Sequence, residues 1–276
     1  MNTLKVIILL ASLSGLLLII GYFIARGTGV MIALILSVIM NFGSYWYSDS
    51  IVLGMCDARP VTRMEAPVLY DAVESLSHKA RIPVPKVYVI PQNSPNAFAT
   101  GRDEDHAAVA VTSGILKILN KDELEGVIAH ELSHIKHKDI LISTMAATIA
   151  SAVVLLSRWA MFFGGNEDSG MIKTIAVAVV APIAATLIQM AISRSREYEA
   201  DAGGAEVSGK PEALAGALAK LARSAERKPM DANPATAHMF IVNPLSGGAI
   251  MNLFSTHPPL EKRIERLMKM KTDRAR

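Results

Sequence analysis

Asn120 to Asp139 reads NKDELEGVIAHELSHIKHKD, and the rest of the chain is organised around this stretch. Of its three histidines, His130 and His134 are four residues apart, so on a helix they lie on one face and can bind one metal ion. Two neutral imidazoles suit zinc at about 2.0–2.1 Å, and the neighbouring Glu131 can take a proton from a water that the metal activates. The stretch opens on an N-cap residue with Glu123 three positions later, a capping-box signature that predicts the required helix.

The composition is too apolar for an ordinary soluble domain. Hydrophobic residues make up 51% of the 276 residues, and the mean hydropathy is +0.33. We therefore expect membrane spans and a lipid bilayer as a partner. The net charge of +3, with no basic run interleaved with aromatics, argues against a nucleic-acid partner. The single cysteine, Cys56, excludes an internal disulfide and has no partner at metal-ligand spacing.

Four apolar runs are predicted to be transmembrane helices. They are Leu4 to Ile24, Val30 to Tyr47, Ile140 to about Phe163, and Ile172 to Ile192. Each is long enough to cross about 30 Å of hydrocarbon, and the first has no small-x-small cleavage site, so we expect it to be retained rather than removed as a signal peptide. The first two runs form a hairpin with almost no loop. For the last two, the alternative is a buried hairpin of a soluble core.

The distribution of lysine and arginine predicts how these spans are oriented. Most basic residues near the span ends fall on one face of a four-span topology. The opposite loops carry Arg26 and the acidic pair Glu167 and Asp168. The positive-inside rule then places both termini and the metal-binding helix in the cytoplasm.

The chain accordingly divides into four segments. These are a transmembrane hairpin at 1–49, a cytoplasmic part with the metal helix at 50–139, a second hairpin at 140–193, and a second cytoplasmic part at 194–276. Local patterns predict helices at about 67–79, 113–119 and 211–228 and after residue 257, strands at 83–90 and 107–112, and a turn-rich segment at 93–101. The predicted fold class is mainly α with a small β-sheet.

A third ligand is predicted directly after the fourth apolar run. His134 lies six residues before the third run and Glu197 five after the fourth, so both stand roughly 8–9 Å above the membrane face and can meet at one ion. Asp201 is four residues beyond Glu197 and shares its helix face, so it can orient a ligating histidine through the other ring nitrogen. The alternative is that the two acids pair with neighbouring arginines on a solvated face.

Four stretches of the chain carry a family resemblance. They are HELSH at His130 to His134, REYEAD at Arg196 to Asp201, NAFA at Asn96 to Ala99, and THPPLEKRIERL at Thr256 to Leu267. They resemble the M48 zinc metallopeptidases, and the four-span layout resembles the HtpX branch of membrane heat-shock proteases. The resemblance covers nearly the whole chain, and its first two motifs are specific in combination.

The resemblance implies a zincin-like metalloprotease domain with one zinc ion per chain. Its ligands would be His130, His134 and Glu197, with Glu131 as the general base. It also implies hydrolysis of misfolded or damaged membrane proteins, in quality control and stress response. The location implied is the cytoplasmic side of a prokaryotic inner membrane.

Two further roles are implied by the resemblance. Asn96, Ala97, Phe98, Ala99 and Thr100 would form an edge strand that aligns the substrate backbone, and His257 with Arg263 would stabilise the oxyanion. An edge strand reads backbone more than side chains, which suits broad specificity. Without the resemblance, a histidine at the start of a helix is more often a cap or packing residue.

Two rival functions remain open from the sequence. An intramembrane metalloprotease would hold its motif inside a span, where flanking charges are costly. Those charges are Lys121, Asp122, Glu123, Lys136 and Lys138. A non-proteolytic scaffold would use a structural zinc site, which normally closes with a fourth protein ligand that the sequence does not supply. Protein substrates are the expected partners, and the oligomeric state is left open.

Overall fold

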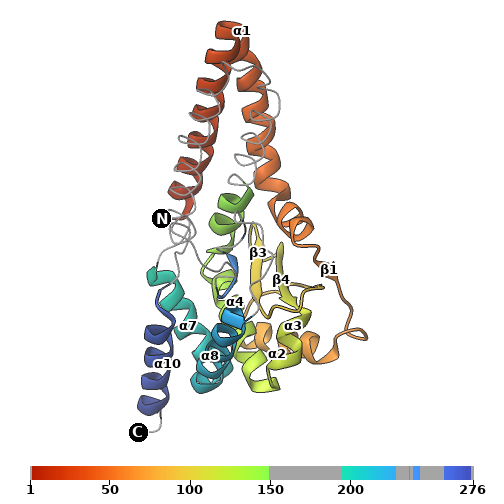
Figure 1. Cartoon of the computed structure of the whole chain (residues 1–276), viewed down its shortest axis with the longest axis vertical. Coiled ribbons are helices and arrows are strands. Elements are labelled where there is room, and N and C mark those ends of the chain that lie inside the picture. Colours follow the sequence, from red (N-terminus) through yellow and green to blue (C-terminus); the bar gives the residue numbers. More distant parts are fainter. Residues whose placement is uncertain (1, 149–193, 228–235, 237–238, 243–257, 275–276) are drawn as a thin grey trace.

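The computed structural model describes residues 2–148, 194–227, 236, 239–242 and 258–274. Over these residues the chain is mainly helical, with a small mixed sheet near its centre and a long helical hairpin at one end (Figure 1). Most of the third and fourth predicted spans and His257 lie outside the described residues.

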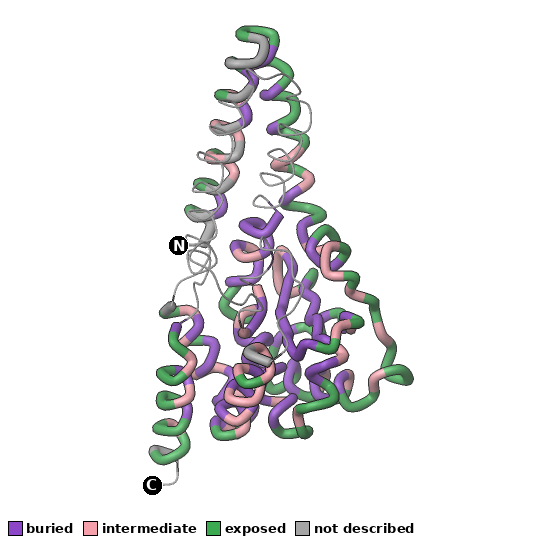
Figure 2. Tube along the Cα trace, viewed as in Figure 1, coloured by how far each residue is buried: buried purple, intermediate pink, exposed green. Residues whose placement is uncertain are grey.

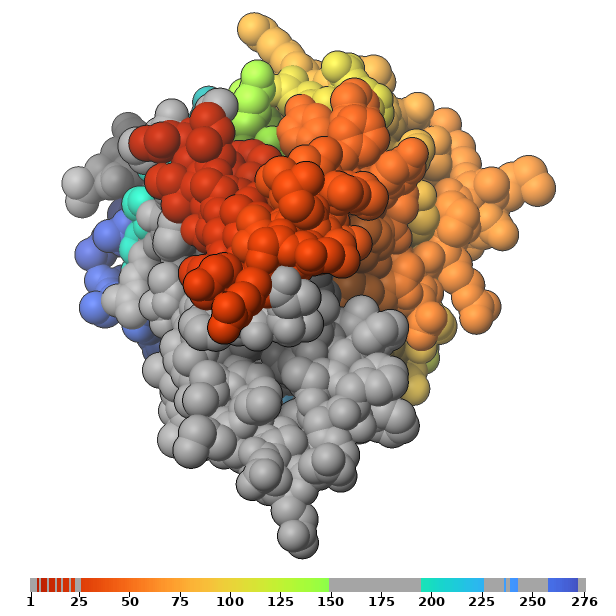
Figure 3. All heavy atoms as spheres, turned by 90° about the horizontal axis from the view of Figure 1, so that it is seen from above, coloured from red at the N-terminus to blue at the C-terminus, as the bar shows by residue number. Residues whose placement is uncertain are grey.

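Helix α1, Asn2–Met55, forms the hairpin, whose two arms lie side by side in the view from above (Figure 3). The chain reverses near Arg26, which has a φ of 45°. The arms touch closely, because the Asn41 amide donates to the Ser14 hydroxyl at 2.8 Å and a side chain at Gly21 would collide with the opposite arm. The hairpin with almost no loop is therefore present as the sequence predicted.

The outer surface of α1 is apolar. Among the described residues, one helix, Arg26–Met55, is long and apolar enough to cross a membrane, and a shorter apolar helix, Val6–Ile19, lies in the other arm. Much of the hairpin is exposed (Figure 2), including isoleucine, leucine, valine and aromatic side chains. An exposed apolar surface of this extent is typical of contact with lipid or protein. The second arm also runs on to Met55, beyond Tyr47 where the sequence placed its end, because its last turns pack on the sheet.

The described residues form a four-stranded sheet in the order β1-β2-β4-β3. Its strands are β1 Arg59–Pro60, β2 Lys86–Ile90, β3 Ala97–Gly101 and β4 Ala107–Thr112. Strands β2 and β4 are parallel, whereas β1 and β3 run antiparallel to their neighbours and lie at the two edges.

Strand β3 corrects one prediction. The segment 93–101 was expected to be turn-rich, yet Ala97 to Gly101 pair with β4 in continuous antiparallel register. Alanine and glycine have low β propensity, so pairing with β4 rather than local preference makes this segment a strand. The edge strand implied at Asn96 to Thr100 is thus present, displaced by one residue.

Of the remaining helices, all but α7, for which no bounds were predicted, have nearly the predicted bounds. They are α2 Pro67–Ala80, α3 Ser113–Ile118, α4 Lys121–Lys136, α7 Arg194–Ser208, α8 Pro211–Arg227 and α10 Leu260–Arg274. Both α2 and α8 begin with a proline, whose missing N–H is not needed in the first helical turn.

The sheet separates two apolar clusters. Val109 and Val111 of β4 face the larger one, built from α2, α4, α7, α8 and α10, while Ala108 and Ala110 face a smaller one with the end of α1. This alternation is the period of two expected for a strand buried on both faces. Helix α4 therefore lies in the main core, which holds its polar residues away from bulk water.

Candidate metal centre

Helix α4 begins at the predicted capping box. The Asn120 side chain accepts from the Glu123 N–H at 2.9 Å, and the Glu123 carboxylate accepts from the Asn120 N–H at 2.9 Å. Lys220 of α8 also donates to Glu123 at 2.7 Å. The start of the helix is fixed in this way, and with it the direction in which His130 and His134 point.

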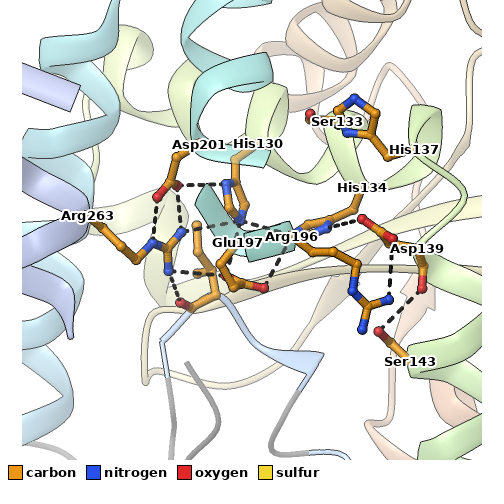
Figure 4. Close-up of polar contacts among 11 residues, drawn as sticks. His130, Ser133, His134, His137, Asp139, Ser143, Arg196, Glu197, Asp201 and Arg263 are labelled. Carbon is orange, nitrogen blue, oxygen red and sulfur yellow. Dashed lines mark hydrogen bonds and ion pairs between the residues drawn. The ribbon is translucent and has the colours of Figure 1, made fainter. Parts of the chain in front are cut away.

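Three side chains converge beside α4 (Figure 4). The Nε2 atoms of His130 and His134 are 3.3 Å apart. Glu197 of α7 places one carboxylate oxygen 3.6 Å from Nε2 of His134 and the other 3.9 Å from Nε2 of His130. Tetrahedral zinc with bonds of about 2.0–2.1 Å separates its donor atoms by about 3.3–3.4 Å. The donor types and their spacing therefore fit a metal ion of this size.

Two adjacent glycines let α7 approach α4 closely. A side chain at Gly204 would meet the backbone of His130, and one at Gly203 would meet the hydroxyl of Ser133. This close contact lies on the same helix as Glu197, about two turns further along. The sequence analysis gave these glycines no role, although a Gly-Gly pair within a helical pattern is itself a sign of close packing.

Asp201 lies behind His130. Its Oδ1 is 3.0 Å from Nδ1 of His130, and its two oxygens accept from Nε and Nη2 of Arg263 at 2.8 and 2.7 Å. Burial alone would raise the pKa of Asp201, but Arg263 and His130 outweigh it and bring the pKa to about 2. Asp201 is therefore an anion at neutral pH, buried with its partner rather than paired on a solvated face.

Arg263 is fully buried at the centre of this group. Besides Asp201, its guanidinium lies 3.4 Å from Glu197 and donates to the Ile241 carbonyl at 3.1 Å. Its Nη2 also lies 3.4 Å from Nε2 of His130, so Arg263 contacts two carboxylates and a histidine of the site as well as the backbone at Ile241. His257, the other residue expected at the oxyanion, lies outside the described residues.

Asp139 is a residue of the site that the sequence analysis missed. Its Oδ2 lies 3.5 Å from Nδ1 of His134, and its Oδ1 accepts from Arg196 at 3.3 Å. Burial lowers the pKa of His134, but the carboxylates of Asp139, Glu197 and Glu131 outweigh it, so the pKa is raised. The available signal was an acid five residues after the second histidine.

Glu131 points toward the edge strand. It is 3% exposed, and burial raises its pKa, against the lowering effect of the two histidines and of the Ala99 N–H, which donates to it. A carboxylate with a raised pKa is a stronger base than an ordinary glutamate. This buried base lies between the histidine pair and β3.

The edge-strand residues Asn96 to Thr100 are all buried. The Asn96 side chain donates to the Val242 carbonyl at 2.7 Å and accepts from the Val242 N–H at 3.3 Å. The Ala97 carbonyl accepts from the Ile241 N–H at 3.0 Å. One end of the outer edge of β3 is therefore already paired with residues 241–242 of the same chain.

The other two edge residues make side-chain contacts on the second face of the sheet. Phe98 packs edge-to-face on Phe240 with ring centroids 5.2 Å apart, and the Thr100 hydroxyl lies 3.0 Å from that of Thr144. Both contacts fix β3 from the face of the sheet opposite α4.

Comparison with known proteins agrees with this architecture. The model of Peptidase family M48 matches residues 64–271. The chain is 56% identical to the Protease HtpX homolog of Desulfatibacillum aliphaticivorans, over 96% of this chain and 89% of that protein. It is 53% identical to the Protease HtpX homolog of Burkholderia mallei (strain SAVP1), over 98% and 97% of the two chains.

A solved structure shows the same fold. The crystal structure of S. mikatae Ste24p superposes with a TM-score of 0.51 at 18% identity, covering 96% of this chain. This chain spans 65% of the length of that one. Since the family model covers well over half of the chain and curated relatives are more than half identical along nearly all of it, the chain belongs to peptidase family M48.

Proposed function

We propose that this metallopeptidase is a zinc-dependent endopeptidase that hydrolyses misfolded or damaged membrane proteins. The observation that carries the proposal is the convergence of His130, His134 and Glu197 on one point beside the buried carboxylate of Glu131. Relatives named Protease HtpX homolog match almost the whole chain, which supports proteolysis, and the exposed apolar surface of α1 supports action at a membrane. The part in quality control and stress response is carried over from the family resemblance of the sequence.

The three converging side chains would hold one zinc ion. When bound, zinc would polarise the attacking water and the scissile carbonyl. Glu131 would take the proton of that water and deliver it to the departing amine, which its raised pKa favours. Three protein ligands leave a coordination position open, which favours catalysis over the structural zinc of a scaffold.

The substrate would be aligned along the edge strand Asn96 to Thr100. Ile241 already pairs with Ala97, so an extended peptide would lie next to Ala99, whose N–H contacts Glu131. Arg263 would lend positive charge to the oxyanion together with His257. Arg263 is buried between Asp201 and Glu197 and forms ion pairs with both, so it would also hold these two carboxylates in position.

We extend the proposal to topology, with four spans in a prokaryotic inner membrane and the site on the cytoplasmic side. Support comes from the lysine and arginine distribution and from the apolar outer face of α1. The start of α4 carries exposed charge, with the Lys121 side chain 74% exposed. A charged and hydrated helix end is unfavourable in hydrocarbon, which argues against the intramembrane rival.

Cysteine labelling of intact cells tests the topology. A cysteine at exposed Thr28, in the hairpin turn, should react with an impermeant maleimide added outside, while one at Lys121 or Arg227 should react only after permeabilisation. Burial raises the pKa of native Cys56 to about 11, so only a small fraction of this thiol is ionised at neutral pH. Because the thiolate is the reactive form, labelling of Cys56 itself should be slow. If the cysteines at Lys121 and Arg227 reacted in intact cells while the one at Thr28 did not, the site would lie on the outer side of the membrane.

Metal removal tests the chemistry. Treating the purified full chain with a zinc chelator should abolish hydrolysis of casein, and added zinc should restore it while magnesium should not, because nitrogen ligands select zinc over hard cations. A zinc-loaded protein with no hydrolysis of casein or of a membrane-protein substrate would favour the scaffold.

A further inference from the structure

The two ligating histidines are supported in the same way. His130 has Asp201 at its Nδ1, and Asp201 is held by Arg263. His134 has a carboxylate at its Nδ1 too, and that carboxylate, Asp139, is held by a different arginine (Figure 4). Metal-bound histidines usually donate their second ring N–H to a carboxylate, which fixes the tautomer and the direction of the ring.

We infer that Asp139, held by Arg196, is a positioning residue that fixes His134 as a metal ligand. The inference rests on the proposed metal site. With Nδ1 directed at Asp139, the proton belongs on Nδ1, so Nε2 keeps its lone pair for the ion. That Nε2 is the atom 3.3 Å from Nε2 of His130 and 3.6 Å from Glu197.

The backbone places Asp139 where this role requires it. Its N–H donates to the carbonyl of His134 at 3.0 Å, and the preceding Lys138 has a left-handed φ of 58°, which turns the chain back under the last turn of α4. The side chain is consequently buried close to the imidazole, with 5% of the residue exposed. A buried carboxylate needs cationic or hydrogen-bonding partners, and Asp139 has Arg196 as its cation and the His134 ring as its neighbour.

Arg196 gives the pair a second effect. It directly precedes Glu197 on α7, whereas Asp139 follows α4. The ion pair of Arg196 with Asp139 therefore joins the helix of the third ligand to the helix of the two histidines, next to the point where the ligands meet. Loss of the pair would leave the orientation of the His134 ring less fixed. It would also let the distance between α4 and α7 vary.

The two supports differ in strength. Asp201 and Arg263 meet at 2.7–2.8 Å with side chains at most 3% exposed, whereas Asp139 and Arg196 meet at 3.3 Å with side chains 7% and 12% exposed. Longer and more hydrated charge pairs are weaker. Disrupting the Asp139 support should therefore cost less metal affinity than disrupting the Asp201 support.

Zinc affinity of the full chain in detergent, measured by competition with a chelating dye, tests the inference. Asp139→Asn and Asp139→Ala should weaken zinc binding by about 10-fold, the lower end of the range for loss of a carboxylate behind a metal-bound histidine and less than for the Asp201 variants, with Asp139→Ala the more severe. The matched control is Asp71→Asn, which removes an exposed carboxylate paired with Arg63 at 2.8 Å. Zinc binding of both Asp139 variants equal to that of the control would overturn the inference.

A double variant separates positioning from simple charge balance. If Asp139 served only to neutralise Arg196, then Asp139→Asn with Arg196→Gln would recover the wild-type zinc affinity. We expect no recovery, because the carboxylate behind His134 is still missing. The zinc-free variants should still unfold cooperatively, at a lower melting temperature because a buried ion pair is broken, and the rise in melting temperature on adding zinc should shrink relative to the wild type. An unfolded zinc-free Asp139→Asn protein would assign the residue a structural role instead.

His134→Ala distinguishes failure of this inference from failure of the proposed site. If His134→Ala loses zinc while Asp139→Asn binds it normally, the site is right and the role of Asp139 is wrong. If His134→Ala also keeps a full equivalent of zinc, the proposed site itself is wrong.

Discussion

Replacing Glu131 with glutamine is expected to reduce peptide hydrolysis by about 10²–10⁴-fold or more while leaving zinc bound. The amide keeps the size of the side chain and can still accept from the Ala99 N–H, but it cannot take a proton from water. Glu131 is not among the three converging ligand residues, so the metal content should be unchanged. Casein hydrolysis and metal content, measured on the same preparation, check this.

The control for this prediction is Glu125→Gln on the same helix. Glu125 is a partly buried carboxylate of α4 that lies outside the site, paired with Lys210 at 3.3 Å and with Lys121 at 4.0 Å. Its loss removes the same charge without touching the site, so turnover should stay near that of the wild type. Normal turnover by zinc-loaded Glu131→Gln would exclude Glu131 as the base.

Replacing Glu197 with alanine is expected to remove most of the bound zinc. Only two protein donors, His130 and His134, would remain, too few for a stable tetrahedral site. Glu199, on the same helix but exposed, is the matched control, and Glu199→Ala should retain a full equivalent of zinc. The zinc content of both variants after dialysis tests this prediction. If Glu197→Ala kept a full equivalent of zinc and Glu199→Ala lost it, the third ligand would be Glu199.

Asp201 should give an intermediate effect on zinc, about 10–100-fold in affinity. The structure adds a second cost, because Asp201→Ala would leave Arg263 buried with less compensation. Breaking a buried pair by removing one partner costs about 3–5 kcal/mol. Asp201→Asn is therefore the better variant, since it retains the shape and part of the hydrogen bonding. If neither Glu197 nor Asp201 affected zinc, the ligand would have to be sought in the C-terminal third, with His257 first.

Local patterns predicted most of the elements that hold the site. The capping box at Asn120 and the four-residue spacing of His130 and His134 act within one helix, and α4 forms as they indicate. The helix after Pro211 and the strand predicted at 83–90 likewise follow from proline placement and from alternation along a few residues, although the strand itself begins only at Lys86. These features depend on neighbours in the sequence, so the sequence can show them.

Elements whose form depends on distant partners were not predicted from local pattern. Segment 93–101 looked like a turn, and it becomes strand β3 through pairing with β4. The second arm of α1 continues to Met55 because its last residues pack on the sheet. Local propensity is weak in both places, and tertiary contacts determine the result.

For the site, the sequence by itself determined the donor types: two histidines at helical spacing, a base between them, and acids after the fourth apolar run. Only the tertiary structure decided which oxygen faces which nitrogen. It brought Arg263 onto Asp201, Ile241 onto the edge strand, and Asp139 with Arg196 onto His134. Spacing along a helix fixes side-chain direction within that helix, whereas contacts between helices depend on how they pack, here through Gly203 and Gly204. That packing is set by the whole core and is not written in any one stretch of the chain.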